Sequence, residues 1–206
     1  MKWFYNFIKF FVKLYICFMY KIELTGRENI PKDKGFMMAS NHVYAFDPIL
    51  LALGTKRHIR FLAKAELCES RHWGWFFKAL GTVSVERGKG DFDVMGKCAK
   101  VIEQGDVLGI FPEGTRSKGH GFLRPKSGMS VIAKMAEADI LPCLIEAPAD
   151  IKFRDKITVK FGKLIPYDSL EIDVNEPRSL KAATRTVWGK ITSMADKEEN
   201  DNEHRN

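Results

Sequence analysis

The chain has 206 residues, of which 45% are hydrophobic and 29% charged, and this balance is typical of a folded globular domain rather than a disordered segment. Its formal charge of +7 at pH 7 suits an anionic partner, such as nucleic acid, anionic lipid or a phosphorylated small molecule. The four cysteines form no C-x-x-C pair, which disfavours a zinc site; we interpret them as buried free thiols in a reducing compartment, with the body of the chain facing the cytoplasm.

Residues 3–20 are the most apolar stretch, and residues 1–20 are predicted to form an amphipathic helix at a membrane surface. Lys2, Asn6, Lys9 and Lys13 recur at helical spacing, and aromatic and aliphatic residues fill most of the remaining positions. A helix lying in the membrane interface ranks first, because a span would place Lys9 and Lys13 near the bilayer centre at about 2.5–3.5 kcal/mol each. A spanning helix ranks second, and a helix packed on the protein's own core third. A cleaved signal peptide is disfavoured by the interrupting lysines.

From residue 21 onward, short apolar runs alternate with longer segments. The runs predicted to be strands are 22–24, 36–39, 59–63, 83–85, 107–111, 140–145 and 157–161. The segments predicted to be helices are 48–53, 73–80, 91–103, 129–136 and 178–195. This alternation predicts an α/β fold, with a central, mostly parallel or mixed sheet flanked by helices.

The predicted organisation is therefore an N-terminal helix at 1–20, one domain at 21–195 and a polar tail at 196–206. The tail carries five acidic and two basic residues, a net charge of −3, so residues 1–195 carry +10. The basic character of the chain belongs to its folded part and its N-terminus.

His42 and Asp47 follow the predicted strand at 36–39, in the sequence His-Val-Tyr-Ala-Phe-Asp-Pro. A carboxylate that orients a histidine makes a general base. Residues five apart point away from each other on a regular strand or helix, so these two side chains meet only if a turn separates strand from helix, and Pro48 favours a helix start there. The alternative is that Asp47 caps the helix and His42 is an ordinary loop residue.

The segment Phe-Pro-Glu-Gly-Thr-Arg-Ser at 111–117 follows another predicted strand. Gly114 permits a left-handed turn, Thr115 offers a hydroxyl, and the planar guanidinium of Arg116 suits a phosphate. Lys64 and Arg87 also follow predicted strands, where α/β sheets usually bind ligands. The alternative for each is a turn with solvent-exposed charges. No G-x-S-x-G elbow, complete P-loop or nucleic-acid signature is present.

Together, these segments resemble the glycerolipid acyltransferase family, specifically the bacterial 1-acyl-glycerol-3-phosphate acyltransferases, over about residues 21–165. The residues at 41–48 are similar to the family's His-x4-Asp block, and those at 61–67 resemble its lysine-containing strand. The second block resembles 81–87, where Glu86 replaces the more usual Asp. The third block resembles 111–117, and the fourth, a proline-containing strand, resembles 140–145.

The resemblance implies roles for these residues. His42 would be the general base and Asp47 its orienting acid. The acceptor's phosphate would be held by Lys64, Arg87 and Arg116, and the site would be shaped by Glu113 and Gly114, with Thr115 also among the substrate-binding residues.

The reaction implied is transfer of a fatty acyl group from acyl-CoA or acyl carrier protein to 1-acyl-glycerol-3-phosphate (lysophosphatidic acid), giving phosphatidic acid in phospholipid biosynthesis, with no metal, cofactor or acyl-enzyme. The expected partners are the acyl donor, lysophosphatidic acid and an anionic membrane surface, with no nucleic acid. The expected location is the cytoplasmic face of the cell membrane, as a peripheral or monotopic protein. The alternatives are the same chemistry on glycerol-3-phosphate or a lysophospholipid, and a non-catalytic, basic membrane-binding module.

Overall fold

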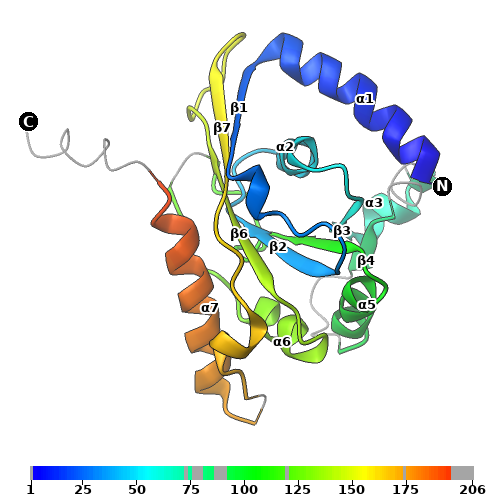
Figure 1. Ribbon diagram of the computed structural model, residues 1–206. Coiled ribbons are helices and arrows are strands. Elements are labelled where there is room, and N and C mark those ends of the chain that lie inside the picture. The colour runs from blue at the N-terminus through cyan, green and yellow to red at the C-terminus, as the bar shows by residue number, and fades with distance from the viewer. Residues whose placement is uncertain are drawn as a thin grey trace, which may run out of the picture.

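The computed structural model describes residues 2–71, 74–75, 81–85, 92–118, 121–173 and 175–195. These residues form a seven-stranded sheet in the order β1-β7-β6-β2-β5-β3-β4 (Figure 1). Neighbouring strands are parallel except for β6 and β7, which are antiparallel. The strands are β1 (Lys21–Thr25), β2 (Phe36–Ser40), β3 (Ile59–Lys64), β4 (Val83–Val85), β5 (Val107–Ile110), β6 (Ile140–Glu146) and β7 (Lys156–Phe161).

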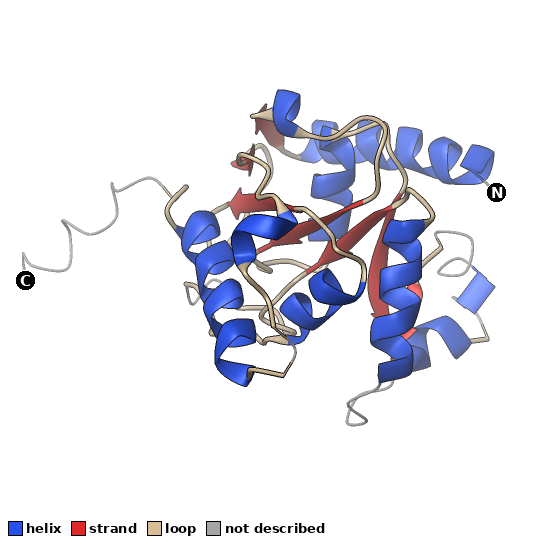
Figure 2. Ribbon diagram, turned by 60° about the horizontal axis from the view of Figure 1, so that its bottom comes forward, coloured by secondary structure: helices blue, strands red, loops and turns tan. Residues whose placement is uncertain are grey.

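Helices cover both faces of this sheet (Figure 2). They are α1 (Lys2–Met19), α2 (Asp47–Gly54), α3 (Ala65–Glu69), α5 (Phe92–Glu103), α6 (Gly128–Met135) and α7 (Pro177–Thr192), with short 3-10 turns η1 (Arg27–Asn29) and η2 (Tyr167–Leu170). The expectation of an α/β fold with a mixed central sheet flanked by helices is confirmed.

Two hydrophobic cores lie on the two faces, because successive side chains of a strand point to opposite sides. In β2, Phe36 and Met38 enter the core beneath α1 and α2, whereas Met37 and Ala39 enter the core beneath α5, α6 and α7. All five residues of β2 are buried, as expected for a central strand with parallel neighbours. This burial holds the end of β2, where His42 follows, in a fixed position.

The structure differs from several sequence predictions. The strand that carries Lys64 ends there, and the chain continues as α3, which periodicity did not predict because five residues are too short a window. Only residues 74–75 of the helix predicted at 73–80 are described, and they are helical. Cys17 is exposed, so the prediction of four buried thiols is wrong at that position; Cys68, Cys98 and Cys143 are buried. The tail at 196–206 lies outside the described residues, and the domain boundaries stay a prediction.

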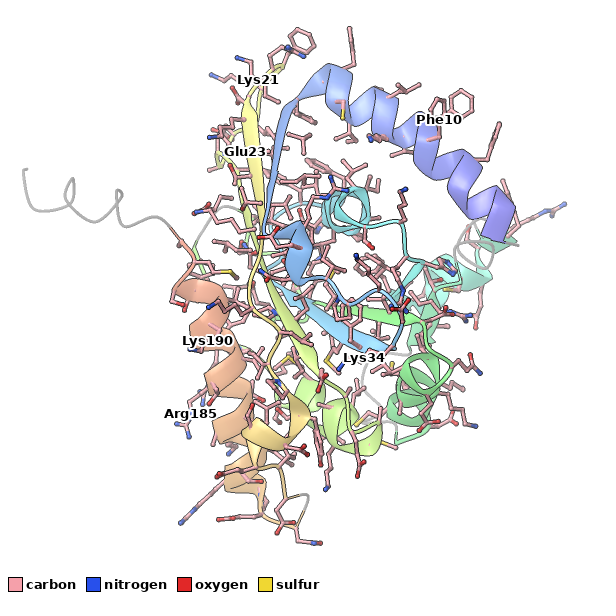
Figure 3. The ribbon with its side chains drawn as sticks, in the orientation of Figure 1. Phe10, Lys21, Glu23, Lys34, Arg185 and Lys190 are labelled. Atoms are coloured by element: carbon pink, nitrogen blue, oxygen red, sulfur yellow. The ribbon has the colours of Figure 1, made fainter. Side chains whose placement is uncertain are left out.

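Helix α1 packs on the rest of the protein through one narrow face. Ile16 is buried and Val12 contacts the same core, so among the side chains of α1 that the structure describes, packing on the protein's own core is seen on this face. The opposite surface exposes large apolar side chains, and Phe10 points outward in Figure 3. Lys13 is exposed, while the side chains of Lys2, Asn6 and Lys9 are not described, so the lysine stripe stays a prediction. Among the described residues, no helix combines the length and apolar character needed to cross a bilayer.

Candidate active site

The site lies at the carboxyl edge formed by β2 and the four strands that run parallel to it, β3, β4, β5 and β6. His42 follows β2, the 111–117 segment follows β5 beside it, and β6 ends on the other side of β2. The ends of parallel strands meet at one edge of a sheet, so residues far apart in the chain converge there.

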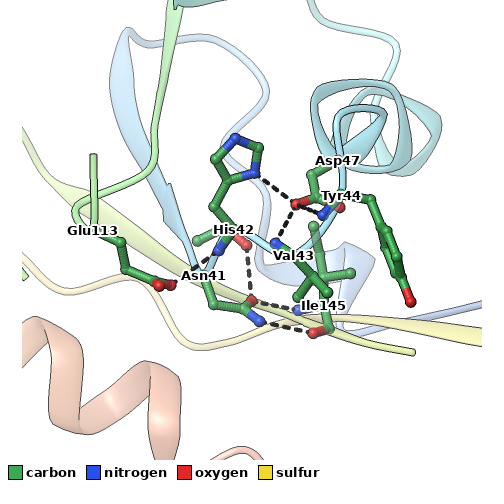
Figure 4. A network of polar contacts seen from close by, with 8 residues as sticks. Asn41, His42, Val43, Tyr44, Asp47, Glu113 and Ile145 are labelled. Carbon is green, nitrogen blue, oxygen red and sulfur yellow. Dashed lines mark hydrogen bonds and ion pairs between the residues drawn. The ribbon is translucent and has the colours of Figure 1, made fainter. Parts of the chain in front are cut away.

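His42 and Asp47 form a close pair. The imidazole Nδ1 lies 2.7 Å from Oδ2 of Asp47, across the turn that joins β2 to α2 (Figure 4). The Asp47 side chain is fully buried, whereas that of His42 is 19% exposed. When the carboxylate accepts a hydrogen bond from Nδ1–H, the lone pair is left on Nε2. That nitrogen points away from Asp47 in Figure 4, which leaves it available to accept a proton.

Asp47 does not act as the N-cap of α2. The helix starts at Asp47 itself, and its N-cap residue is Phe46, which makes no side-chain cap. Oδ2 of Asp47 instead accepts the backbone N–H groups of Val43 at 2.6 Å and Tyr44 at 2.9 Å. Oδ1 is buried and has no hydrogen-bond partner among the described residues. The carboxylate therefore points back toward the loop, where it fixes both the backbone and the imidazole.

The 111–117 segment makes hydrogen bonds to both backbone polar groups of His42, its N–H and its carbonyl. Oε1 of Glu113 accepts the N–H of His42 at 3.0 Å, and the N–H of Ser117 donates to the carbonyl oxygen of His42 at 2.8 Å. Oε2 of Glu113 accepts the N–H of Leu123 at 3.2 Å. Both carboxylate oxygens face the protein's own backbone, which suits Glu113 to shaping the site; direct contact with a substrate stays a prediction.

Glu113 is 3% exposed. Burial is the largest effect and raises its pKa above the ordinary value of 4.5, and the negative charge of Asp47 acts in the same direction. The backbone hydrogen bonds from His42 and Leu123 oppose the rise, as does the charge of His42. The site thus keeps a second carboxyl group beneath the histidine at an electrostatic cost.

Asn41 is a positioning residue that the sequence did not single out. Its amide donates to the carbonyl of Ile145 at 2.8 Å and accepts the N–H of Ile145 at 2.8 Å. The side chain thereby pairs with the backbone of β6 as another strand residue would, just before His42. An asparagine directly after a buried strand was the available signal, but its partner lies 104 residues away.

A stack of rings supports the imidazole. The rings of His42 and Phe111 are stacked with centroids 4.1 Å apart, and Phe111 in turn stacks on Phe61 of β3 at 5.8 Å. Phe61 occupies space left open by Gly109, where an added Cβ would lie 2.2 Å from the ring. The absence of a side chain at position 109 thus contributes to the orientation of His42.

Two cationic side chains lie at this loop, those of Arg116 and Lys126. Arg116 is exposed, next to Ser117, and has no ion pair among the described residues; Thr115 is exposed as well. Gly114 has φ +71, the left-handed turn that the sequence predicted. The side chain of Lys126 crosses Gly114, with Nζ 3.0 Å from where a Cβ would lie. Sequence reasoning did not identify Lys126, because its position depends on the fold of the 121–127 segment.

Lys64 and Arg87 are placed less fully. Lys64 is the last residue of β3, at the same edge as His42, but its side chain is not described. Arg87 lies outside the described residues. Their contact with a phosphate stays a prediction. Within the described part of the chain, no group of three or more His, Cys, Asp and Glu side chains is arranged to hold a metal ion.

The strand-edge site and its His–Asp pair belong to an α/β protein, and the geometry of the pair suits general-base chemistry. The Acyltransferase family model matches residues 21–146, which is more than half of the chain, and the chain therefore belongs to that family.

Individual relatives agree with this assignment. The chain is 31% identical over 132 residues to a 1-acyl-sn-glycerol-3-phosphate acyltransferase of Bacillus subtilis, covering 64% of this chain and 65% of that protein. It is 27% identical over 150 residues to the 1-acyl-sn-glycerol-3-phosphate acyltransferase of Streptococcus pneumoniae, and this match covers 70% of this chain and 55% of that protein. The matches span about half to two thirds of the length of these curated relatives.

A solved structure shares the fold. The crystal structure of the 1-acyl-sn-glycerophosphate acyltransferase from Thermotoga maritima superposes with a TM-score of 0.72 at 25% identity, covering 92% of this chain and 79% of that chain.

Proposed function

We propose that this protein transfers a fatty acyl group from an acyl thioester to the free hydroxyl of 1-acyl-glycerol-3-phosphate, giving phosphatidic acid. The observation that carries the proposal is the His42–Asp47 pair, with Nε2 directed away from the carboxylate and the backbone of His42 held by the 111–117 segment. The acyltransferase names of the relatives support the choice of reaction.

His42 acts as the general base. Its Nε2 takes the proton of the acceptor hydroxyl as the oxygen attacks the thioester carbonyl carbon. The tetrahedral intermediate then collapses, the carbon–sulfur bond breaks, and the departing thiolate takes up the proton from the imidazolium. Asp47 stabilises the imidazolium that exists between these two steps. The chemistry requires two substrates and the side chains of the chain itself, so we assign no metal or cofactor.

The cations beside this pair bind the acceptor's phosphate. Arg116 is exposed within the segment that holds His42, and Lys126 lies across Gly114 of the same segment. A phosphate anchored there positions the hydroxyl, so part of the rate enhancement comes from orientation. We include Lys64 and Arg87 in this role from their positions after β3 and β4. A phosphate-binding acceptor site favours lysophosphatidic acid and glycerol-3-phosphate over neutral acceptors.

The decisive experiment is acyl transfer by the purified protein. Labelled acyl-CoA and acyl carrier protein are each incubated with lysophosphatidic acid, glycerol-3-phosphate or lysophosphatidylcholine, and the products are separated. Phosphatidic acid from wild type, and almost none from a His42→Ala variant with an unchanged melting temperature, is the expected result. Equal turnover by that variant removes His42 from the reaction, and vesicle binding without turnover on any acceptor favours a non-catalytic module.

We also propose that α1 holds the protein at an anionic membrane on the cytoplasmic side, where both acyl-chain substrates reside. Phe10 and Leu14 are exposed on its outer surface. Deleting the helix would uncover the core that Ile16 covers, so replacing Phe10 and Leu14 with Ser is the cleaner test. We expect the double variant to sediment less with anionic vesicles. Equal sedimentation, with the fold intact, would contradict the membrane role.

A further inference from the structure

The loop between β6 and β7, residues 147–155, is joined to the carboxyl end of α1. The backbone N–H of Arg154 donates to the carbonyl of Met19 at 2.7 Å, and its guanidinium donates to the carbonyl of Phe18 at 3.5 Å. The N–H of Lys21 donates to the carbonyl of Asp155 at 2.9 Å. The last carbonyl groups of a helix have no partner within the helix, and here the loop supplies hydrogen-bond donors for two of them. The end of α1 and the loop therefore form one corner of the molecule.

Two exposed phenylalanine rings meet at this corner. Phe18 is 66% exposed and Phe153 is 59% exposed, and their ring centroids lie 5.7 Å apart. The loop around Phe153 is closed by its own hydrogen bond, from the N–H of Lys152 to Oδ2 of Asp155 at 2.7 Å. The exposed ring therefore projects from a loop that is tied both to itself and to α1.

Phe153 continues the exposed apolar surface of α1 beyond the end of the helix. Phe7, Phe11, Leu14 and Phe18 recur at helical spacing along that surface, and all are exposed. Phe153 adds a further ring from a segment more than 130 residues away. It is flanked in sequence by Lys152 and Arg154, both exposed, and aromatic rings with adjacent cations suit the boundary between lipid headgroups and acyl chains.

We propose that Phe153, together with Lys152 and Arg154, forms a second lipid-binding contact, so that the protein meets an anionic bilayer through the β6–β7 loop as well as through α1. This inference rests on the proposed function in one respect, since acyl-chain substrates give a reason for the site to face lipid.

The same loop also reaches the catalytic pair. The hydroxyl of Tyr44 donates to the carbonyls of Pro148 and Ala149, the latter at 3.1 Å, while its backbone N–H donates to Oδ2 of Asp47 at 2.9 Å. A bilayer that contacts Phe153 is thus linked through one residue to the carboxylate that orients His42. The loop sets the position of the His–Asp pair relative to the lipid surface.

The test compares full-length variants in co-sedimentation with phosphatidylcholine vesicles, with and without phosphatidylglycerol. Phe153→Ala should bind about five- to tenfold more weakly than wild type, and Phe153→Trp should bind at least as well as wild type, because indole partitions into the interface. Lys152→Ala should weaken binding only when phosphatidylglycerol is present. The matched control is Met135→Ala: Met135 is an exposed apolar residue on α6, at the far end of the molecule from α1 in Figure 1.

Vesicle binding by Phe153→Ala that equals binding by Met135→Ala overturns the inference. So does a loss of affinity for acyl carrier protein with vesicle affinity unchanged, because the surface would then belong to a protein partner. Turnover on a dispersed, short-chain acceptor separates this inference from the proposed function. If Phe153→Ala binds vesicles as wild type does and wild type turns over the acceptor, only the lipid contact is rejected. If Phe153→Ala binds vesicles more weakly but neither wild type nor any variant turns over an acceptor, only the proposed reaction is rejected.

Discussion

The backbone N–H of His42 donates a hydrogen bond to Oε1 of Glu113, which lies 71 residues further along the chain. Through this bond the 111–117 segment determines where the histidine sits, although it contributes none of the atoms of the His–Asp pair. The N–H of Ser117 binds the carbonyl of the same residue, so both ends of His42 are held by a single loop. The two motifs depend on each other for geometry.

Glu113→Gln tests this dependence through stability and its pH profile. Glutamine has one acceptor oxygen for two backbone N–H groups, so the variant should lose about 1–3 kcal/mol of unfolding free energy. Because burial raises the pKa of Glu113 above 4.5, the folded state binds this proton more tightly than the unfolded state does. The stability that this tighter proton binding gives to the folded state is fully present below pH 4.5. It is lost as the pH rises through the raised pKa of Glu113.

The measurement is urea unfolding of both proteins across this pH range. The free energy of wild type minus that of the variant should decrease as pH rises, since Gln does not titrate. A difference that instead increases with pH would mean that the two backbone hydrogen bonds to the carboxylate outweigh its burial.

Asp47→Asn should reduce turnover by about 10²–10⁴-fold, because the imidazolium loses its stabilising charge. The asparagine oxygen replaces Oδ2, and its NH₂ group then occupies the buried position of Oδ1, where no acceptor is present among the described residues. Folding should persist with a modest loss of stability. Steady-state kinetics and thermal melting check both expectations, with the exposed Asp168→Asn as control. Full turnover with reduced stability would give Asp47 a purely structural role.

The pairing of His42 with Asp47 was accessible from sequence because it is local. A buried strand, a turn and Pro48 constrain the few residues between them, and only one arrangement lets the two side chains meet. The strands were accessible for a similar reason, since short apolar runs such as that of β2 suit a sheet buried on both faces.

Long-range partners were not accessible in the same way. Nothing in the 111–117 segment indicates that the carboxylate of Glu113 binds two backbone N–H groups, because the N–H of Leu123 approaches only after the 121–127 segment folds back. The pairing of Asn41 with Ile145 depends on β2 lying beside β6, which is a property of the sheet order. The position of Phe153 beside Phe18 likewise depends on β7 running parallel to β1.

Arg116→Ala and Lys126→Ala should each raise KM for the phosphorylated acceptor by about 10- to 100-fold, the value of one charge-assisted hydrogen bond. KM for the acyl donor should change little. Arg185→Ala is the control, because Arg185 is an exposed arginine on α7 (Figure 3). Initial rates with each substrate varied in turn provide the measurement. Equal increases in KM for both substrates would indicate that the loop has been disturbed and that the phosphate contact is not specific.

Gly109→Ala tests whether packing beneath the site orients the imidazole. The added Cβ would lie 2.2 Å from the ring of Phe61, which must move and carry with it the stacked rings of Phe111 and His42. Overpacking of this kind should cost about 1–3 kcal/mol of stability and should lower kcat more than it raises KM.

The smaller side chain in Phe61→Leu should compensate for the added methyl group, so the double variant should be more stable than the sum of the two single effects predicts. The control is Gly189→Ala on α7, where a Cβ meets nothing within 4 Å. There alanine should leave turnover unchanged and stabilise the helix by up to about 1 kcal/mol. The measurements are denaturant unfolding and kcat for wild type and all four variants. An unchanged kcat in Gly109→Ala, at reduced stability, would separate the ring stack from the orientation of His42.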